Sequence, residues 1–450
     1  MTANNDLPTV RIENIHQYVG QKVRLQGWLF SRRGSGKVQF IHARDGSGFI
    51  QCVMGKADVS EEMFATARSL SQETAIEITG LVQAEERAPY CGHEIHAETV
   101  AIVSPSENYP ITRKPHGDAF LMDHRHLWLR TRKQNLILRV RATLVKAIRD
   151  YFDNNGFVLM DSPIFTPNAC EGTSTLFETD WFDDRKAYLS QSGQLYQEAT
   201  AMAFGKTYCF GPTFRAEKSK TRRHLNEFWM VEPEVAFMDL EGNMALAEDF
   251  LRTVVQTALD KHGDELEKTL ERDLSTLKNI TQPFVRLSYD EAVQKIQELQ
   301  AQCEDEEERK MMEIEWGMDF GGRHETLLTQ QYDTPIIIYN FPSQVKAFYM
   351  KKNPERPEVA LCLDVLAPEG CGEIIGGGQR EDNLELLLSE IDRHGLDKKD
   401  FEWYLDLRRF GSVPHGGFGL GLERLVGWVC GVHHVRETIP FARTLDRLSP

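Results

Sequence analysis

The sequence predicts an α+β protein in which a small N-terminal β-barrel precedes a larger domain of mixed strands and helices. Three observations support this prediction. Residues 22–104 alternate apolar and polar side chains in short runs, the segment after them mixes proline, glycine and charge without periodicity, and residues 132–157 follow the period of a long amphipathic helix. At 450 residues the chain has room for two or three domains. We therefore expect a barrel domain over 1–107, a hinge over 108–131 and a second domain over 132–450 with a helical insertion at about 260–330.

The first domain has the order of strands and helix that is typical of an OB-fold. Five candidate strands are "KVRLQGWLFS", "KVQFIHARD", "GFIQCVMG", "TAIEITGLVQ" and "HEIHAETVAIV", and the helical run "SEEMFATARSL" lies between the third and the fourth. The stretch from Lys22 to Arg44 holds six basic residues and no acid, although the formal net charge of the chain is −16. Cations beside aromatic side chains are typical of surfaces that bind unpaired bases. We expect Phe40 and Gln51 on that surface and Trp28 in the barrel core.

The second domain is expected to begin with a long helix and an edge strand. Leu136, Val140 and Leu144 fall on one helical face, and "NNG" ends the helix. The strand "VLMDSPIF" that follows is interrupted by Pro163, which confines it to the edge of a sheet. An edge of this kind often meets a second subunit, so we expect a homodimer formed through residues 132–165.

A basic loop joins two apolar-rich strands in "FRAEKSKTRRHLNEF", residues 214–228. Arg215, near the end of the first strand, can direct its guanidinium at an α-phosphate. Phe228, at the start of the second strand, can stack on a base. The cations between them can reach distal phosphates or the end of an RNA.

Two carboxylates lie in "LDVLAPEGCGEIIGGGQRED", residues 363–382. Asp364 and Glu373 fall on neighbouring strand segments, and two carboxylates together with substrate phosphates are the usual ligands of Mg²⁺. The glycines at 376–378 leave room for a ligand. A turn with exposed charges is an equally good interpretation of this segment taken alone.

Near its end the chain passes from glycines directly into a helical pattern, in "GGFGLGLERLVGW", residues 416–428. The spacing G-x-G-x-G differs from the dinucleotide-binding fingerprint, whose parallel βαβ context is also missing. The glycines allow the backbone to approach a ligand closely. Arg424, one turn into the helix, is placed to clamp a phosphate.

Taken together, these segments resemble the class II aminoacyl-tRNA synthetases. "FRAE…RRHLNEF" resembles motif 2 of that family, "GGFGLGLERL" resembles motif 3, and the long helix ending in "DSPIF" resembles motif 1, in the order that the family has. An N-terminal OB-fold is the anticodon-binding domain of the aspartate, asparagine and lysine subgroup, so the resemblance covers nearly the whole chain. It implies that residues 132–450 form an antiparallel sheet flanked by helices, and not a doubly wound parallel sheet.

The resemblance also implies how ATP and tRNA bind. Arg215 would hold the α-phosphate of a bent ATP, Arg424 the γ-phosphate, and Phe228 would stack on adenine against Arg424. The implied ATP-binding residues are Arg215, Glu217, Arg223, His224, Phe228, Asp364, Glu373 and Arg424, of which Asp364 and Glu373 would carry Mg²⁺. The implied tRNA-binding residues are Phe40 and Gln51 at the central anticodon base, Arg33 at a neighbouring contact, and Lys218, Lys220 and Arg222 at the acceptor end. Aspartyl relatives often have a serine where Gly376 stands, so water is expected in place of a third protein ligand to the metal.

The segment "LSQSGQLYQEA", residues 189–199, bears on the choice of amino acid. Aspartate members of the family read QSPQ, followed by a lysine that pairs with the substrate carboxylate; here Gly193 replaces the proline and Gln197 the lysine. This segment and "CEGTSTLFETDWF" resemble the asparagine-specific members. A side-chain amide needs a donor and an acceptor, which Arg380 and Glu232 can supply. The implied amino-acid-binding residues are Glu171, at the α-ammonium group, and Gln194, Gln197, Glu232 and Arg380.

The resemblance therefore implies that asparagine, ATP and tRNA(Asn) are the substrates. A non-discriminating aspartyl-tRNA synthetase is the nearest alternative, but aspartate would set its carboxylate against Glu232 with Gln197 in place of the lysine. An asparagine synthetase built on the same core would have no use for the OB-fold. A non-catalytic nucleic-acid binder would not need Arg215, Phe228 and Arg424 intact.

Composition indicates the compartment. No apolar run approaches the ~18 residues that span a bilayer, and the start "MTANNDLPTV" has no secretory signal. The eight cysteines are scattered without a CxxC pair, which is typical of reduced thiols. We expect a cytoplasmic protein without membrane contact.

Overall fold

The computed structural model describes residues 7–167, 170 and 175–449, and its contacts divide the chain into two compact units between Arg130 and Thr131. Most of the segment that we expected to be a hinge belongs to the first unit. It contains two short helices, α2 (Asp118–Asp123) and α3 (Arg125–Trp128). In the part of the chain that is described, no helix combines the length and the apolarity needed to cross a membrane.

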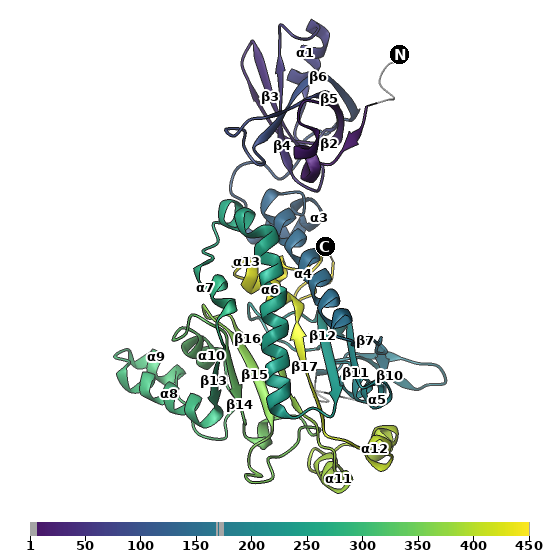
Figure 1. Ribbon diagram of the computed structural model, residues 1–450, viewed down its shortest axis with the longest axis vertical. Helices are drawn as coiled ribbons and strands as arrows, with labels where there is room; N and C mark the ends of the chain where they lie inside the picture. The colour runs from purple at the N-terminus through teal and green to yellow at the C-terminus, as the bar shows by residue number, and fades with distance from the viewer. Residues whose placement is uncertain (1–6, 168–169, 171–174, 450) are drawn as a thin grey trace. The chain divides into compact units, whose positions relative to one another are not determined.

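The first unit, described from residue 7 onward, is a closed barrel (Figure 1). Its strands are β1 (Thr9–Val10), β2 (Lys22–Gly34), β3 (Val38–Arg44), β4 (Phe49–Gly55), β5 (Ala75–Ala84) and β6 (His93–Ser104). Pairing of β2 with β5 closes the barrel, and α1 (Glu61–Ser69) lies between β4 and β5 as the sequence predicts. The Ser60 hydroxyl caps α1 by accepting a hydrogen bond from the Met63 amide at 3.2 Å. The prediction of an OB-fold barrel is confirmed.

The expectation for Trp28 is wrong. Its side chain is 38% exposed, and the Arg44 guanidinium lies 4.7 Å from the ring centroid. Successive side chains of a strand point to opposite faces. Val23, Leu25 and Leu29 of β2 point into the barrel, so Trp28 points outward.

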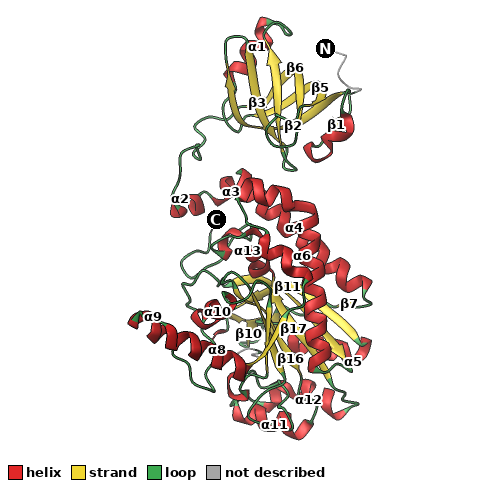
Figure 2. Ribbon diagram, turned by 60° about the vertical axis from the view of Figure 1, so that its left-hand side comes forward, coloured by secondary structure: helices red, strands yellow, loops and turns green. Residues whose placement is uncertain are grey.

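A large mixed sheet forms the centre of the second unit (Figures 1 and 2). In the described residues its strand order is β13 (Val285–Ser288), β14 (Ile336–Tyr339), β15 (Cys362–Ala367), β16 (Gly372–Gln379), β17 (His415–Gly421), β12 (Glu227–Ala236), β11 (Lys206–Phe214) and β7 (Val158–Leu159). The central pairings are antiparallel, as the family resemblance implies, whereas β13–β14 and β7–β11 at the two edges are parallel. A small separate sheet contains β8 (Phe165–Thr166), β9 (Glu178–Asp180) and β10 (Lys186–Leu189).

Helices pack against the large sheet and build the core. The long helix α4 (Arg132–Asn154) buries the predicted face with Leu136, Val140 and Leu144, and it packs against α6 (Leu240–Leu270). The others in the described residues are α5 (Gln194–Phe204), α7 (Ser275–Lys278), α8 (Tyr289–Gln302), α9 (Glu306–Met311), α10 (Gly322–Thr329), α11 (Leu384–Arg393), α12 (Glu402–Arg409) and α13 (Leu422–Cys430).

The segment at about 260–330, which we expected as a helical insertion, is not helical throughout. It contains β13, which pairs with β14 in parallel register. Val285 and Leu287 of β13 pack against a cluster that includes Ile336 and Ile338. Burial of these alternating apolar side chains explains why this short segment joins the sheet.

Three strands at the centre of the large sheet approach each other at glycines. A Cβ atom on Gly377 of β16 would lie 2.4 Å from the Gly417 carbonyl oxygen, and one on Gly417 of β17 would lie 2.1 Å from the Pro233 carbonyl oxygen of β12. Real Cβ atoms do not approach backbone this closely. The glycines are therefore needed for β12, β17 and β16 to be neighbours.

We expect Gly377→Ala to lower the free energy of unfolding by about 2 kcal/mol or more, because the new methyl group collides with backbone that cannot yield. Gly211→Ala is the matched control, since a Cβ atom at this position of β11 meets no atom within 4 Å. Its effect should stay within about 0.5 kcal/mol. Urea denaturation measures both, and similar midpoints for the two variants would contradict the prediction.

Candidate active site

The basic loop is closed by a side chain that the sequence did not single out, Asn226. β11 and β12 pair with Thr213 opposite Phe228. Beyond this pair, the Arg215 amide donates to the Asn226 carbonyl oxygen at 3.0 Å. The Asn226 side-chain amide donates to the carbonyl oxygens of Arg215 at 2.8 Å and Glu217 at 3.0 Å. Asn226 thereby fixes where Arg215 leaves the strand.

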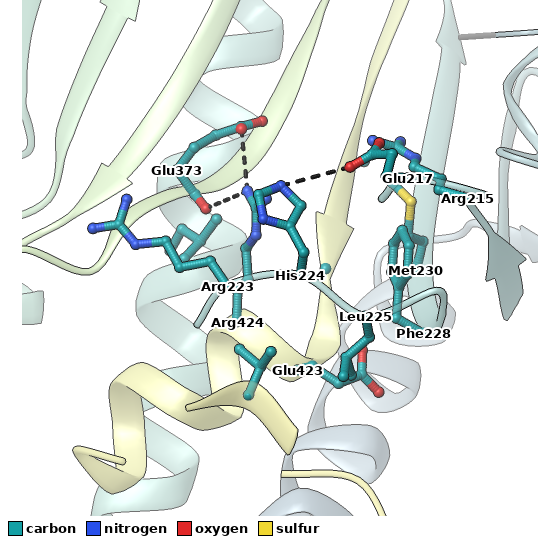
Figure 3. A pocket seen from close by; sticks show the side chains of 14 residues that line it. Arg215, Glu217, Arg223, His224, Leu225, Phe228, Met230, Glu373, Glu423 and Arg424 are labelled. Atoms are coloured by element: carbon teal, nitrogen blue, oxygen red, sulfur yellow. Dashed lines mark hydrogen bonds and ion pairs between the residues drawn. The ribbon is translucent and has the colours of Figure 1, made fainter. Parts of the chain in front are cut away.

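A pocket opens between this loop and the start of α13 (Figure 3). Its walls include Arg215, Glu217, Arg223, His224, Phe228, Glu373 and Arg424, so the structure brings together seven of the eight residues expected to bind ATP. The Arg215 guanidinium lies 5.5 Å from the centroid of the Phe228 ring. Arg424 donates from Nη1 to the Glu373 carbonyl oxygen at 2.9 Å and to the Glu373 carboxylate at 3.1 Å.

His224 is a neutral group of this pocket. Its Nε2 atom lies 3.7 Å from the Glu217 carboxylate. Burial, reinforced by the charge of Arg424, lowers the pKa of His224 below its ordinary value. At neutral pH the ring therefore offers one donor and one acceptor and no charge.

Arg223 also lines the pocket, but its guanidinium is engaged by protein groups. It forms an ion pair with Glu325 at 2.9 Å and donates to the Thr326 hydroxyl at 3.0 Å and to the Gly370 carbonyl oxygen. These contacts tie the basic loop to α10 and to the turn between β15 and β16. In this conformation Arg223 positions the loop.

A second pocket adjoins the first and shares Arg215, Met230, Glu373 and Gly419 with it. Asp364 lies in this second pocket, where its carboxylate accepts from Lys346 Nζ at 2.8 Å. Burial raises the pKa of Asp364 to about 7, against the opposing effect of the Lys346 ammonium. Nothing in the sequence around Lys346 indicated this pairing.

The Asp364 and Glu373 carboxylates converge over Gly376. A Cβ atom on Gly376 would lie 2.8 Å from Glu373 Oε1 and 3.5 Å from Asp364 Oδ1. Burial alone would raise the pKa of Glu373, but the cations Arg424 and Lys346 lower this pKa below its ordinary value. Two carboxylate oxygens facing one open space fit Mg²⁺, which takes one or two carboxylates and completes its shell with phosphate and water. Among the described residues, no cluster of three or more His, Cys, Asp and Glu side chains has metal-binding geometry.

Arg380 lines the second pocket and is 1% exposed. It pairs with Glu234 at 2.9 Å and donates from Nη2 to the Gln194 side-chain oxygen. Its Nη1 atom lies 3.6 Å from the Met350 sulfur. Glu234 was not among the residues expected from the sequence, although the two-residue period of β12 puts it on the same face as Glu232.

Glu232 is 4% exposed and lines the same pocket. Its carboxylate accepts from the Ser192 hydroxyl, from the Gly193 amide at 2.8 Å and from the Cys209 thiol at 3.3 Å. A proline at position 193 could not supply this amide hydrogen. Gly193, which stands where the aspartate members have proline, therefore supplies a hydrogen bond to Glu232 that proline could not supply.

One of the residues expected to bind the amino acid, Gln197, does not line this pocket. The Gln197 side chain is buried outside the pocket lining and donates to the Met160 carbonyl oxygen at 2.9 Å and to the Ser162 hydroxyl at 3.1 Å. Because these acceptors hold its amide, Gln197 fixes the Met160–Ser162 segment and does not face the pocket. Glu171 lies outside the described residues.

The expected tRNA contacts belong to both units of the chain. In the barrel, Arg33 pairs with Phe40 across β2 and β3, and its guanidinium lies 5.3 Å from the Phe40 ring. Gln51 is 6% exposed and donates to Glu94 at 3.0 Å, so its amide is already engaged. At the tip of the basic loop the exposed cations are Lys218, Lys220 and Arg222.

Comparisons with known proteins agree with this geometry. The family model "tRNA synthetases class II (D, K and N)" matches residues 117–445, and the model "OB-fold nucleic acid binding domain" matches residues 23–103. The chain belongs to the class II tRNA synthetases of this group. The synthetase is 56% identical to an asparagine–tRNA ligase of Sorangium cellulosum, over 99% of this chain and 100% of the relative, and 55% identical to one of Chloroflexus aurantiacus, over 99% of both.

Solved structures show the same likeness. The synthetase matches asparaginyl-tRNA synthetase from Pyrococcus horikoshii complexed with asparaginyl-adenylate with a TM-score of 0.90 and 44% identity, over 98% of this chain and 99% of the other. It matches the Entamoeba histolytica asparaginyl-tRNA synthetase in complex with asparaginyl-adenylate with a TM-score of 0.87 and 31% identity, over 99% of both chains.

We expect Arg215→Ala and Arg424→Ala each to lower kcat/KM for ATP in amino-acid-dependent ATP–pyrophosphate exchange by about 100-fold or more, because each removes a cation from the pocket where phosphate charge would develop. Arg409→Ala is the matched control, since Arg409 is an exposed arginine of α12 that donates to Glu402 and Asp406. Wild-type rates in either pocket variant would remove that arginine from the proposed site.

Proposed function

We propose that this synthetase activates asparagine with ATP and transfers the asparaginyl group to the 3′ end of tRNA(Asn). The observation that carries the proposal is the junction of the two pockets, where the arginines of the first adjoin the Glu232 and Arg380 groups of the second. The relatives named asparagine–tRNA ligase match over 98–99% of the chain, and they confirm this prediction over a non-discriminating aspartyl-tRNA synthetase.

In the first step the asparagine carboxylate attacks the α-phosphorus of ATP. A carboxyl-oxygen–phosphorus bond forms, the bond to the β-phosphate bridging oxygen breaks, and pyrophosphate leaves. The second step transfers the asparaginyl group to a hydroxyl of the tRNA end and releases AMP. Such chemistry depends mainly on positioning and on charge neutralisation.

Residues of the two pockets supply both the positioning and the charge neutralisation. We assign Arg215 to the α-phosphate, because it stands where the two pockets meet, and Arg424 to the distal phosphates. Phe228 offers a ring face for adenine, with the Arg215 guanidinium nearby. Neutral His224 can donate to a phosphate or accept from a base without adding charge.

We also propose that Asp364 and Glu373 hold Mg²⁺ together with the ATP phosphates. The convergence of both carboxylates over Gly376 supports this assignment. A bound Mg²⁺ ion would neutralise phosphate charge and favour departure of pyrophosphate.

Asp364→Asn and Glu373→Gln should each raise the Mg²⁺ concentration for half-maximal exchange by about 10-fold, because the metal loses a charged ligand. Glu385→Gln, at an exposed carboxylate in the first turn of α11, is the matched control and should leave it unchanged. Titrating the exchange rate against Mg²⁺ measures this concentration. An unaltered half-maximal Mg²⁺ concentration in both Asp364→Asn and Glu373→Gln would contradict the assignment.

The substrate amide fits between Arg380 and Glu232. Arg380 can donate to the amide oxygen through Nη1, since Nε and Nη2 are held by Glu234 and Gln194. Glu232 can accept from the amide nitrogen. Because Glu234 already offsets the charge of Arg380, the carboxylate of an aspartate would meet Glu232 unfavourably.

ATP–pyrophosphate exchange with asparagine and aspartate in parallel tests the function. We expect exchange with asparagine and a kcat/KM for aspartate lower by about 10⁴-fold. Glu232→Gln should weaken this preference by about 10-fold or more, since it removes the charge that repels aspartate. Exchange with aspartate alone would refute the proposal, and unchanged selectivity in the variant would remove Glu232 from the role.

The same proposal includes the binding partners and the cellular compartment. The loop-tip cations would face the acceptor end of tRNA, and Arg33 with Phe40 would meet the anticodon. We infer a homodimer through residues 132–165, supported by the position of β7 at the edge of the large sheet and by the exposed side chains of Val158, Leu159, Ile164 and Phe165. The cytoplasm stays the predicted compartment.

A further inference from the structure

The Glu232 carboxylate is held by a set of neutral donors. Glu232 Oε1 accepts from the Ser192 hydroxyl, and Oε2 accepts from the Gly193 amide at 2.8 Å and from the Cys209 thiol at 3.3 Å. Ser192 is 5% exposed and Cys209 is 4% exposed, so these bonds form away from bulk water. Buried hydrogen bonds to a charged acceptor are stronger than those between neutral groups.

Each donor is itself fixed by its surroundings. Ser192 Oγ accepts from the Gln194 amide, at the first residue of α5, at 3.0 Å, so its own hydrogen is directed to Glu232. Burial, reinforced by the charge of Glu232, raises the pKa of Cys209 well above its ordinary value, so the thiol keeps the proton that it donates. A Cβ atom on Gly193 would lie 2.6 Å from both Cys209 Sγ and Ser162 Oγ, so this position has room only for backbone.

The neighbouring carboxylate is held differently. Glu234 pairs with the Arg380 guanidinium at 2.9 Å, and both side chains are 1% exposed. That pair carries no net charge. The hydroxyl, amide and thiol around Glu232 stabilise its carboxylate while adding no positive charge to it. On β12, Glu234 is thus bound to a cation, whereas the hydroxyl, amide and thiol that donate to Glu232 are neutral groups.

We propose that Ser192 and Cys209, together with the Gly193 amide, are specificity-determining positioning groups of this synthetase. They aim the Glu232 carboxylate at the substrate side-chain amide and keep it negatively charged, so that it accepts from asparagine and repels aspartate. The inference rests on the proposed function and makes the selectivity that Glu232 confers depend on three groups that act through its carboxylate.

The test is ATP–pyrophosphate exchange with asparagine and with aspartate on the full chain. For Ser192→Ala and Cys209→Ala we expect the ratio of the asparagine and aspartate kcat/KM values to fall by about 10-fold or more, with the KM for ATP unchanged. Cys209→Ser keeps a donor at the same position and should retain most of the selectivity. Cys430→Ala is the matched control, because Cys430 of α13 is equally buried and lies outside both pockets.

The outcomes separate this inference from the function itself. A wild type that does not prefer asparagine refutes the proposed function. A selective wild type whose Ser192→Ala and Cys209→Ala variants keep its ratio overturns the inference. A loss that is equal for both amino acids also overturns it, because a role in packing alone affects both substrates alike. Thermal unfolding shows which variants fold. If only one of Ser192→Ala and Cys209→Ala folds, that variant alone decides the test.

Discussion

The active site depends on the close approach of backbone strands at the centre of the large sheet. Gly417 of β17 lies against the Pro233 carbonyl, and Gly377 of β16 lies against β17, with no room for a Cβ atom at either position. This spacing makes β12, β17 and β16 neighbours, and their antiparallel register sets Gly376 opposite Gly419. A Cβ atom on Gly419 would lie 2.5 Å from the Met230 methyl carbon, so glycine also keeps the wall that both pockets share open.

Behind the amino-acid pocket, buried charges are paired in a network that gives the pocket its rigidity. The Glu198 carboxylate is fully buried and accepts from Tyr404 at 2.7 Å, Arg408 at 2.6 Å, His415 at 2.8 Å and the Gln194 side chain at 3.0 Å. Burial alone would raise the pKa of Glu198, but Arg408 and His415 outweigh it and lower this pKa. Removing one partner from a buried pair leaves an uncompensated charge and costs about 3–5 kcal/mol. The network therefore holds Gln194, and through it Arg380, in one arrangement.

The sequence predicted the elements whose signal is local. The barrel strands follow from their two-residue period, and α4 follows from its apolar face. The same two-residue period, counted from the inward-facing residues of β2, places Trp28 outside the core, although we had expected it inside. β13 was missed because a four-residue strand has little periodicity of its own and is held by its pairing with β14. The local sequence pattern predicted the structure least well where pairing between distant segments determined it.

The sequence by itself determined the chemistry that the protein carries: the arginines and Phe228 of the first pocket, the two carboxylates over Gly376, and the change from proline to Gly193. The tertiary structure alone decided which buried partners these groups receive. Arg380 meets Glu234 and Gln194 across 146 and 186 residues of sequence, and Lys346 meets Asp364 from a neighbouring loop. Gln197 is turned away from the pocket for the same reason. Side-chain partners over such separations are set by strand register and by helix packing, and a local sequence pattern records neither.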